Sequence, residues 1–98
     1  MASSLKSATF LIESRIRDAA RGDYNAAYDL GIIYSTGTQG ASIDLIEAHK
    51  WFNLAAVWGS EAAQQCRADV AEDMTAREIA EAQRQARAFL TMNSARAA

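Results

Sequence analysis

The chain has 98 residues, of which half are apolar, 22% are charged and none is proline. Its formal net charge of −2 disfavours a nucleic-acid partner, because proteins that bind nucleic acids usually present a basic face. Its single cysteine excludes an internal disulfide and a cysteine-rich metal site, and we expect neither a metal nor another cofactor.

Abundant alanine and the absence of proline favour one all-α domain over residues 1–98. The N-terminal apolar stretch is broken by Glu13 and Arg15, so it is too short for a signal peptide or a membrane span. We therefore expect a cytoplasmic protein with no membrane partner.

The first helix is expected over residues 5–21, where apolar residues recur at steps of three and four. They are Leu5, Ala8, Ile12, Ile16, Ala19 and Ala20. Ser4 is placed to cap the start of this helix, and Gly22 to end it. A second helix is expected over residues 24–35, with Asp23 as its N-cap.

A loop with two glycines leads to a third helix, expected over residues 45–58. Asp44 is its predicted N-cap, with Glu47 as the reciprocal partner of a capping box. Ser60 is the predicted N-cap of a fourth helix over residues 61–72.

The fifth helix is expected over residues 76–91. It begins with a capping box in which Thr75 and Glu78 satisfy each other's backbone N–H groups. Met74 is placed to contact Ile79 across this box. The tail from residue 93 onward is expected to be frayed.

An internal repeat links the middle helices. Gly22-x-x-x-Ala26 returns 37 residues later as Gly59-x-x-x-Ala63, and an alanine pair precedes each copy. The intervening residues include Leu30-Gly31-x-x-Tyr34 and Ala48-x-x-Trp51. Glycine inside a helix is costly, so Gly31 indicates a close approach of two helices, and Trp51 is the expected wedge between helices.

This pattern resembles the Sel-one-like repeat, a relative of the tetratricopeptide repeat, and residues 47–56 are typical of its bacterial members. The resemblance implies a short right-handed α-solenoid of about five antiparallel helices. In this interpretation, residues 5–21 form a degenerate N-terminal helix, residues 22–58 a full repeat and residues 59–91 a C-terminal capping hairpin.

Three candidates for catalytic or metal-binding residues have simpler structural interpretations. His49 is the single histidine and has no evident metal partners, so we expect a surface or half-buried side chain. Cys66 is expected to behave as a small buried hydrophobe. The acidic residues Asp69, Glu72 and Asp73 are expected to form a solvated turn. The sequence therefore predicts no enzyme.

Two surfaces are candidates for binding another protein or a peptide segment. The resemblance implies that the helix over residues 24–35 lines a concave face, with Asn25, Asp29 and Ile32 pointing into it. Part of this stripe belongs to the core, and Tyr28 is expected to pack against the first helix. Trp58 stands in a position that is usually polar in the family. It either anchors a partner or packs under the first helix or the tail of the last one.

The leading functional hypothesis is a non-catalytic adaptor or accessory subunit of a cytoplasmic bacterial complex. It rests on analogy of fold. The alternative is a structural protein that forms homo-oligomers through the ends of its solenoid. A small hydrolase of the repeat family comes third, because the members linked to hydrolysis are rich in cysteine.

Overall fold

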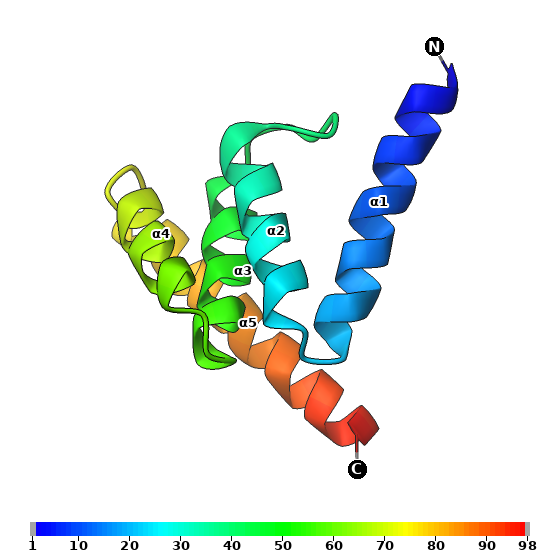
Figure 1. Ribbon diagram of the computed structural model, residues 1–98. Coiled ribbons are helices and arrows are strands. Elements are labelled where there is room, and N and C mark those ends of the chain that lie inside the picture. Colours follow the sequence, from blue (N-terminus) through cyan, green and yellow to red (C-terminus); the bar gives the residue numbers. More distant parts are fainter. Residues whose placement is uncertain (1, 98) are drawn as a thin grey trace.

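The computed structural model describes the backbone of residues 2–97 and the side chains of residues 8–93. This part of the chain forms five α-helices, which confirms the all-α prediction (Figure 1). They are α1 (Ala2–Ala20), α2 (Tyr24–Thr36), α3 (Leu45–Val57), α4 (Glu61–Ala71) and α5 (Ala76–Ala97).

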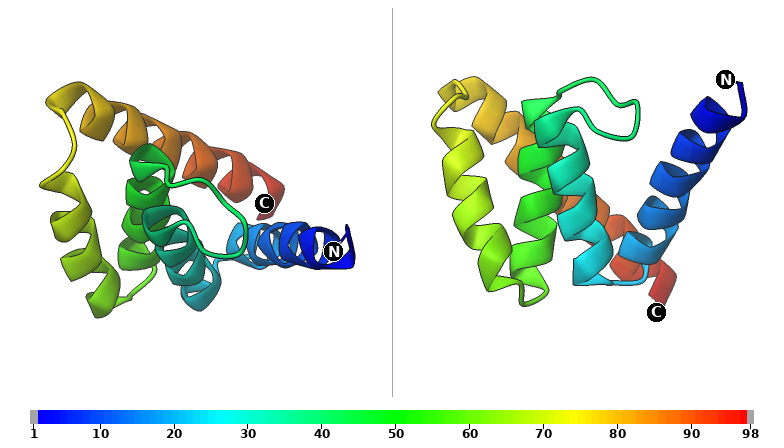
Figure 2. Two further views of the ribbon diagram at one scale, coloured as in Figure 1. Left: turned by 90° about the horizontal axis from the view of Figure 1, so that it is seen from above. Right: turned by 45° about the horizontal axis from the view of Figure 1, so that its top comes forward.

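Helix packing follows the order of the chain. Helix α2 lies between α1 and α3, and α3 in turn packs against α4. These four helices run alternately up and down (Figure 1). Helices α4 and α5 diverge from the turn that joins them, and α5 runs obliquely behind α3 (Figure 2). The central helix of the domain is therefore α3, which contacts α2, α4 and α5.

The predicted N-caps of α2 and α4 are confirmed. Asp23 Oδ1 accepts hydrogen bonds from the backbone N–H groups of Asn25 at 2.9 Å and Ala26 at 3.3 Å. Ser60 Oγ accepts one from the N–H of Ala63 at 3.2 Å. Each cap satisfies donors that the first turn of a helix leaves unpaired.

The cap of α3 forms only in part as predicted. Asp44 Oδ1 accepts from the N–H of Glu47 at 3.1 Å, as expected. The Glu47 carboxylate does not close the capping box, because it binds the next turn of its own helix instead. It accepts from Trp51 Nε1 at 3.0 Å and from Lys50 Nζ at 2.9 Å.

The capping box of α5 is complete. The Thr75 N–H donates to Glu78 Oε1 at 2.8 Å, and the Glu78 N–H donates to Thr75 Oγ1 at 3.1 Å. The prediction is thus confirmed in both directions.

Two helix ends differ from the prediction by more than one residue. Helix α1 begins at Ala2, before the predicted cap Ser4, whose side chain lies outside the described residues. Helix α5 continues to Ala97, although a frayed tail was expected from residue 93. No glycine or proline occurs before Gly22 or after Gly59, so the sequence holds none of the usual terminators at either end.

The core forms around α3, where Phe52 and Leu54 are almost fully buried. Helix α2 reaches Phe52 through Gly31: a Cβ atom at this glycine would lie 2.5 Å from two carbons of the Phe52 ring. The predicted close approach is therefore confirmed. On the other side of α3, the buried Trp51 ring meets Phe89 of α5 edge-on, with 5.1 Å between centroids.

The position of Tyr28 corrects a sequence-based expectation. This residue was expected to pack against the first helix. Its ring instead lies 5.8 Å from that of Phe52, and its hydroxyl oxygen is 3.8 Å from Cys66 Sγ on α4. The reason is that α2 has apolar side chains on most of its circumference, so the pattern does not indicate which neighbour each side chain meets.

Candidate functional site

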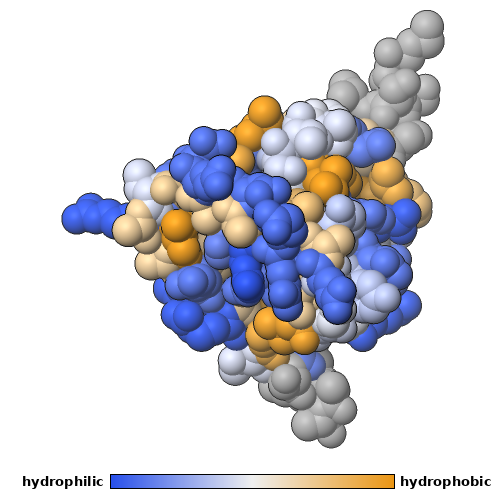
Figure 3. All heavy atoms as spheres, turned by 60° about the vertical axis from the view of Figure 1, so that its left-hand side comes forward, coloured by the Kyte–Doolittle hydropathy of each residue, from blue (hydrophilic) through white to orange (hydrophobic). Residues whose placement is uncertain are grey.

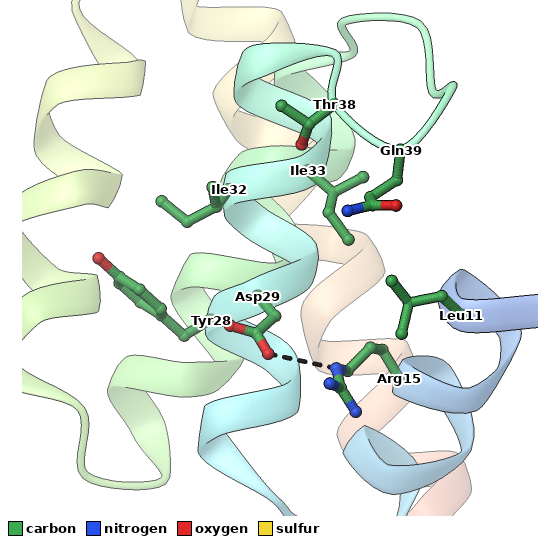
Figure 4. A pocket seen from close by; sticks show the side chains of 8 residues that line it. All are labelled: Leu11, Arg15, Tyr28, Asp29, Ile32, Ile33, Thr38 and Gln39. Atoms are coloured by element: carbon green, nitrogen blue, oxygen red, sulfur yellow. Dashed lines mark ion pairs between the residues drawn. The ribbon is translucent and has the colours of Figure 1, made fainter. Parts of the chain in front are cut away.

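An open groove lies between α1, α2 and the loop that follows α2 (Figure 4). Its volume is about 490 Å³, within the range of clefts that bind ligands. We call it the α1–α2 groove. It is lined by Leu11, Arg15, Tyr28, Asp29, Ile32, Ile33, Thr38 and Gln39.

An ion pair crosses the groove. Arg15 Nε of α1 lies 3.2 Å from Asp29 Oδ2 of α2, and Arg15 Nη1 lies 3.8 Å from Asp18 Oδ2 (Figure 4 shows the first contact). The Arg15 and Asp29 side chains are 36% and 50% exposed. A pair this accessible to water contributes at most about 1 kcal/mol to stability. Both groups therefore remain available to a ligand.

The loop above the groove has a defined shape. Gly37 ends α2 with a φ of 73°, and its N–H donates to the Ile33 carbonyl at 2.9 Å. Gln39 has a φ of 57° and is the non-glycine residue with positive φ in the described part of the chain. Backbone strain of this kind concentrates at functional sites. Together with Thr38, Gln39 forms the polar rim of the groove.

The predicted concave-face residues separate into two groups. Asp29 and Ile32 line the groove. Asn25 does not line it, because this exposed residue lies in the first turn of α2, beside its cap. No motif in the sequence indicates a binding role for Leu11, Arg15 or the two rim residues. The paired glycines of the loop are a sequence signal that could have pointed to the rim.

Trp58 lies away from the groove, immediately after α3. It is half-buried, and its ring centroid is 6.4 Å from that of Phe89 on α5. This contact corresponds to the packing alternative, in which the last helix covers the tryptophan. Its neighbour Val57 is 59% exposed.

His49 corrects another expectation. We predicted a surface or half-buried histidine, but the side chain is only 3% exposed. Its Nδ1 atom has no hydrogen-bond partner among the described residues. Burial, and secondly the charge of Arg67 on α4, lower the pKa of His49 from its usual value. The Arg67 guanidinium is held by Asn53 of α3, with Nη1 donating to Oδ1 at 2.6 Å.

Cys66 is half-buried between helices, and its contact with Tyr28 raises the pKa of that phenol. The acidic residues Asp69, Glu72 and Asp73 are exposed, as predicted. Asp69 accepts a hydrogen bond from Gln65 on its own helix. Within the described residues, no group of three histidine, cysteine or acidic side chains is arranged to hold a metal ion.

Among the described helices, none combines the length and the apolar character needed to cross a membrane. No protein-family model matches the chain, and neither a curated protein nor a solved structure is significantly similar to it.

Proposed function

We propose that this domain is a non-catalytic protein-interaction module that binds a segment of another protein in the α1–α2 groove. The observation that carries the proposal is the groove itself, which has apolar walls, a half-exposed ion pair and a polar rim. Protein interfaces commonly combine an apolar centre with polar groups around it. The resemblance to Sel-one-like repeats, which rests on the sequence motifs, adds the expectation of an adaptor or accessory subunit.

The α4 end of the domain, which lies away from the groove, gives less support to the alternative of homo-oligomers formed through the ends of the domain. The face that carries α4 is predominantly hydrophilic, and its hydrophobic patches are separate (Figure 3). Permanent interfaces between identical subunits are usually larger and more apolar than this. We therefore favour a different protein as the partner over a stack of identical chains.

The proposal is tested with arginine scanning of the purified chain used as bait. Thr38→Arg places a long side chain at the rim of the groove, and Gln64→Arg places the same side chain on the exposed face of α4. Both sites are exposed, so stability should change by less than about 0.5 kcal/mol. We expect a captured partner to bind wild type and Gln64→Arg equally and to lose at least about tenfold in affinity for Thr38→Arg, about 1.4 kcal/mol.

Equal binding by all three proteins would show that the groove is not the interface. Trp58→Ala then tests the other candidate surface, where truncation of an aromatic anchor should remove about 2 kcal/mol of binding free energy. Because Trp58 packs on Phe89, a melting curve must accompany that measurement.

A further inference from the structure

The internal repeat is visible in the backbone as well as in the sequence. Helices α1 and α3 end 37 residues apart, and α2 and α4 begin 37 residues apart. The turns match in detail: the N–H of Asp23 donates to the carbonyl of Asp18, and the N–H of Ser60 donates to that of Ala55. The α1–α2 pair is thus an earlier copy of the α3–α4 pair.

The later copy has a helix packed over it. Helix α2 contacts α3 through Gly31, which meets the ring of Phe52, and it reaches α4 through Tyr28, which meets Cys66. Subtracting the repeat length of 37 residues from Phe52 and Cys66 gives Arg15 and Asp29. The two members of the ion pair therefore occupy the positions that α2 covers one repeat later, and the α1–α2 groove corresponds to the place of that covering helix.

The side chains at these positions differ in a way that indicates reversible binding. Phe52 is 1% exposed under its permanent neighbour, whereas Arg15 and Asp29 are charged and in part accessible to water. A charged pair keeps the groove stable in water when it is empty, and an exposed aromatic would not. Two carboxylates, Asp18 and Asp29, flank the one guanidinium, which leaves a surplus negative charge.

We propose that the α1–α2 groove binds an amphipathic α-helix of a partner protein, which takes the position that α2 takes against α3 and α4. Its apolar stripe contacts Leu11, Ile32 and Ile33, as in other complexes of a helix with a groove. A lysine or arginine beside this stripe pairs with Asp29. The inference rests on the proposed function, since it specifies the segment that the groove receives.

The test uses three synthetic peptides of equal length and the full chain labelled with ¹⁵N. The first peptide is helical, with a leucine stripe flanked by lysines. The second has glutamates in place of the lysines, and the third is the lysine peptide with a central proline. We expect the lysine helix to shift the amide resonances of Leu11, Arg15, Asp29 and Ile32. It should bind at least about fivefold more tightly than either other peptide, and Asp29→Asn should remove most of its advantage over the glutamate peptide.

Each other outcome overturns a stated part of the inference. Equal binding by the proline peptide would mean that the groove receives an extended segment, which leaves the proposed function intact. Equal binding by the glutamate peptide would contradict the basic partner. Resonances of groove residues that shift on dilution of the protein alone would identify a second copy as the occupant. No shift with any peptide refutes a helix-binding groove, and the arginine variants then decide the proposed function separately.

Discussion

Gly31→Ala probes the closest contact between two helices in the domain. The new Cβ would lie 2.5 Å from Cδ1 and from Cε1 of Phe52 and 2.8 Å from its Cγ, whereas ordinary contact begins at 3.4 Å. The ring cannot retreat freely, because Phe52 is 1% exposed and the ring of Tyr28 lies 5.8 Å from it. The substitution must therefore push α2 away from α3.

The magnitude follows from two opposing effects. Overpacking of a core costs about 1–3 kcal/mol. The higher helix propensity of alanine offsets up to about 1 kcal/mol of this. We expect a net loss of up to about 2 kcal/mol in the free energy of unfolding, measured by urea denaturation followed by circular dichroism.

A double-mutant cycle with Phe52→Leu distinguishes the steric clash from other effects. Leucine removes most of the ring, so Gly31→Ala in that background should be neutral or stabilising. The coupling free energy should then be about 1 kcal/mol or more. A Gly31→Ala variant that is more stable than wild type, with no coupling to residue 52, would refute the helix contact on which this reasoning depends.

Three further predictions concern other parts of the domain. Trp51→Ala should lower the free energy of unfolding by about 3–5 kcal/mol, because it removes a buried ring that packs on Phe89; an unchanged denaturation midpoint would contradict this. Asp29→Lys places two cations side by side and should cost at most about 1 kcal/mol of stability. The added change Arg15→Asp reverses the ion pair and should restore the melting temperature; a double variant that melts no higher than Asp29→Lys would contradict the pairing. Since the pKa of His49 is lowered from 6.5 in the folded protein, the unfolded chain binds the proton more readily, and stability should fall as the pH drops below about 6.5. Denaturation at pH 7.5 and 5.5 should show a smaller loss for His49→Gln than for wild type, and equal losses would count against the buried neutral histidine.

Local signals in the sequence predicted the helices well. Polar residues before the last four apolar runs located the caps of α2 to α5, and Asp23, Ser60 and Thr75 all form the expected hydrogen bonds. Gly31 was informative for a different reason. Glycine destabilises a helix interior relative to alanine, and here a larger residue would clash with Phe52 of the neighbouring helix. These features involve residues within one or two turns of each other, or a single residue with one strong physical preference.

Long-range partners were harder to predict. Glu47 has the right spacing for a capping box, but Trp51 one turn later offers an indole N–H that competes for the same carboxylate. His49 is buried on α3, which packs against three other helices, and no pattern around a lone histidine indicates which neighbours will cover it. Tyr28 belongs to a helix with apolar residues on most sides, so periodicity does not assign its direction.

The groove illustrates how a repeat can supply information that periodicity lacks. Arg15 stands out in the sequence only as a charge that interrupts an apolar stretch, and Asp29 only as a polar residue on an apolar helix. Their relation becomes visible only by comparison with Phe52 and Cys66, which occupy the equivalent positions in the next copy and contact α2. Among the described residues, no helix packs over Arg15 and Asp29 as α2 packs over Phe52 and Cys66, and under the proposal their charges define the chemistry of the partner that takes this place. The ion pair contributes little to stability, but its position in the repeat supports the proposal of a binding surface.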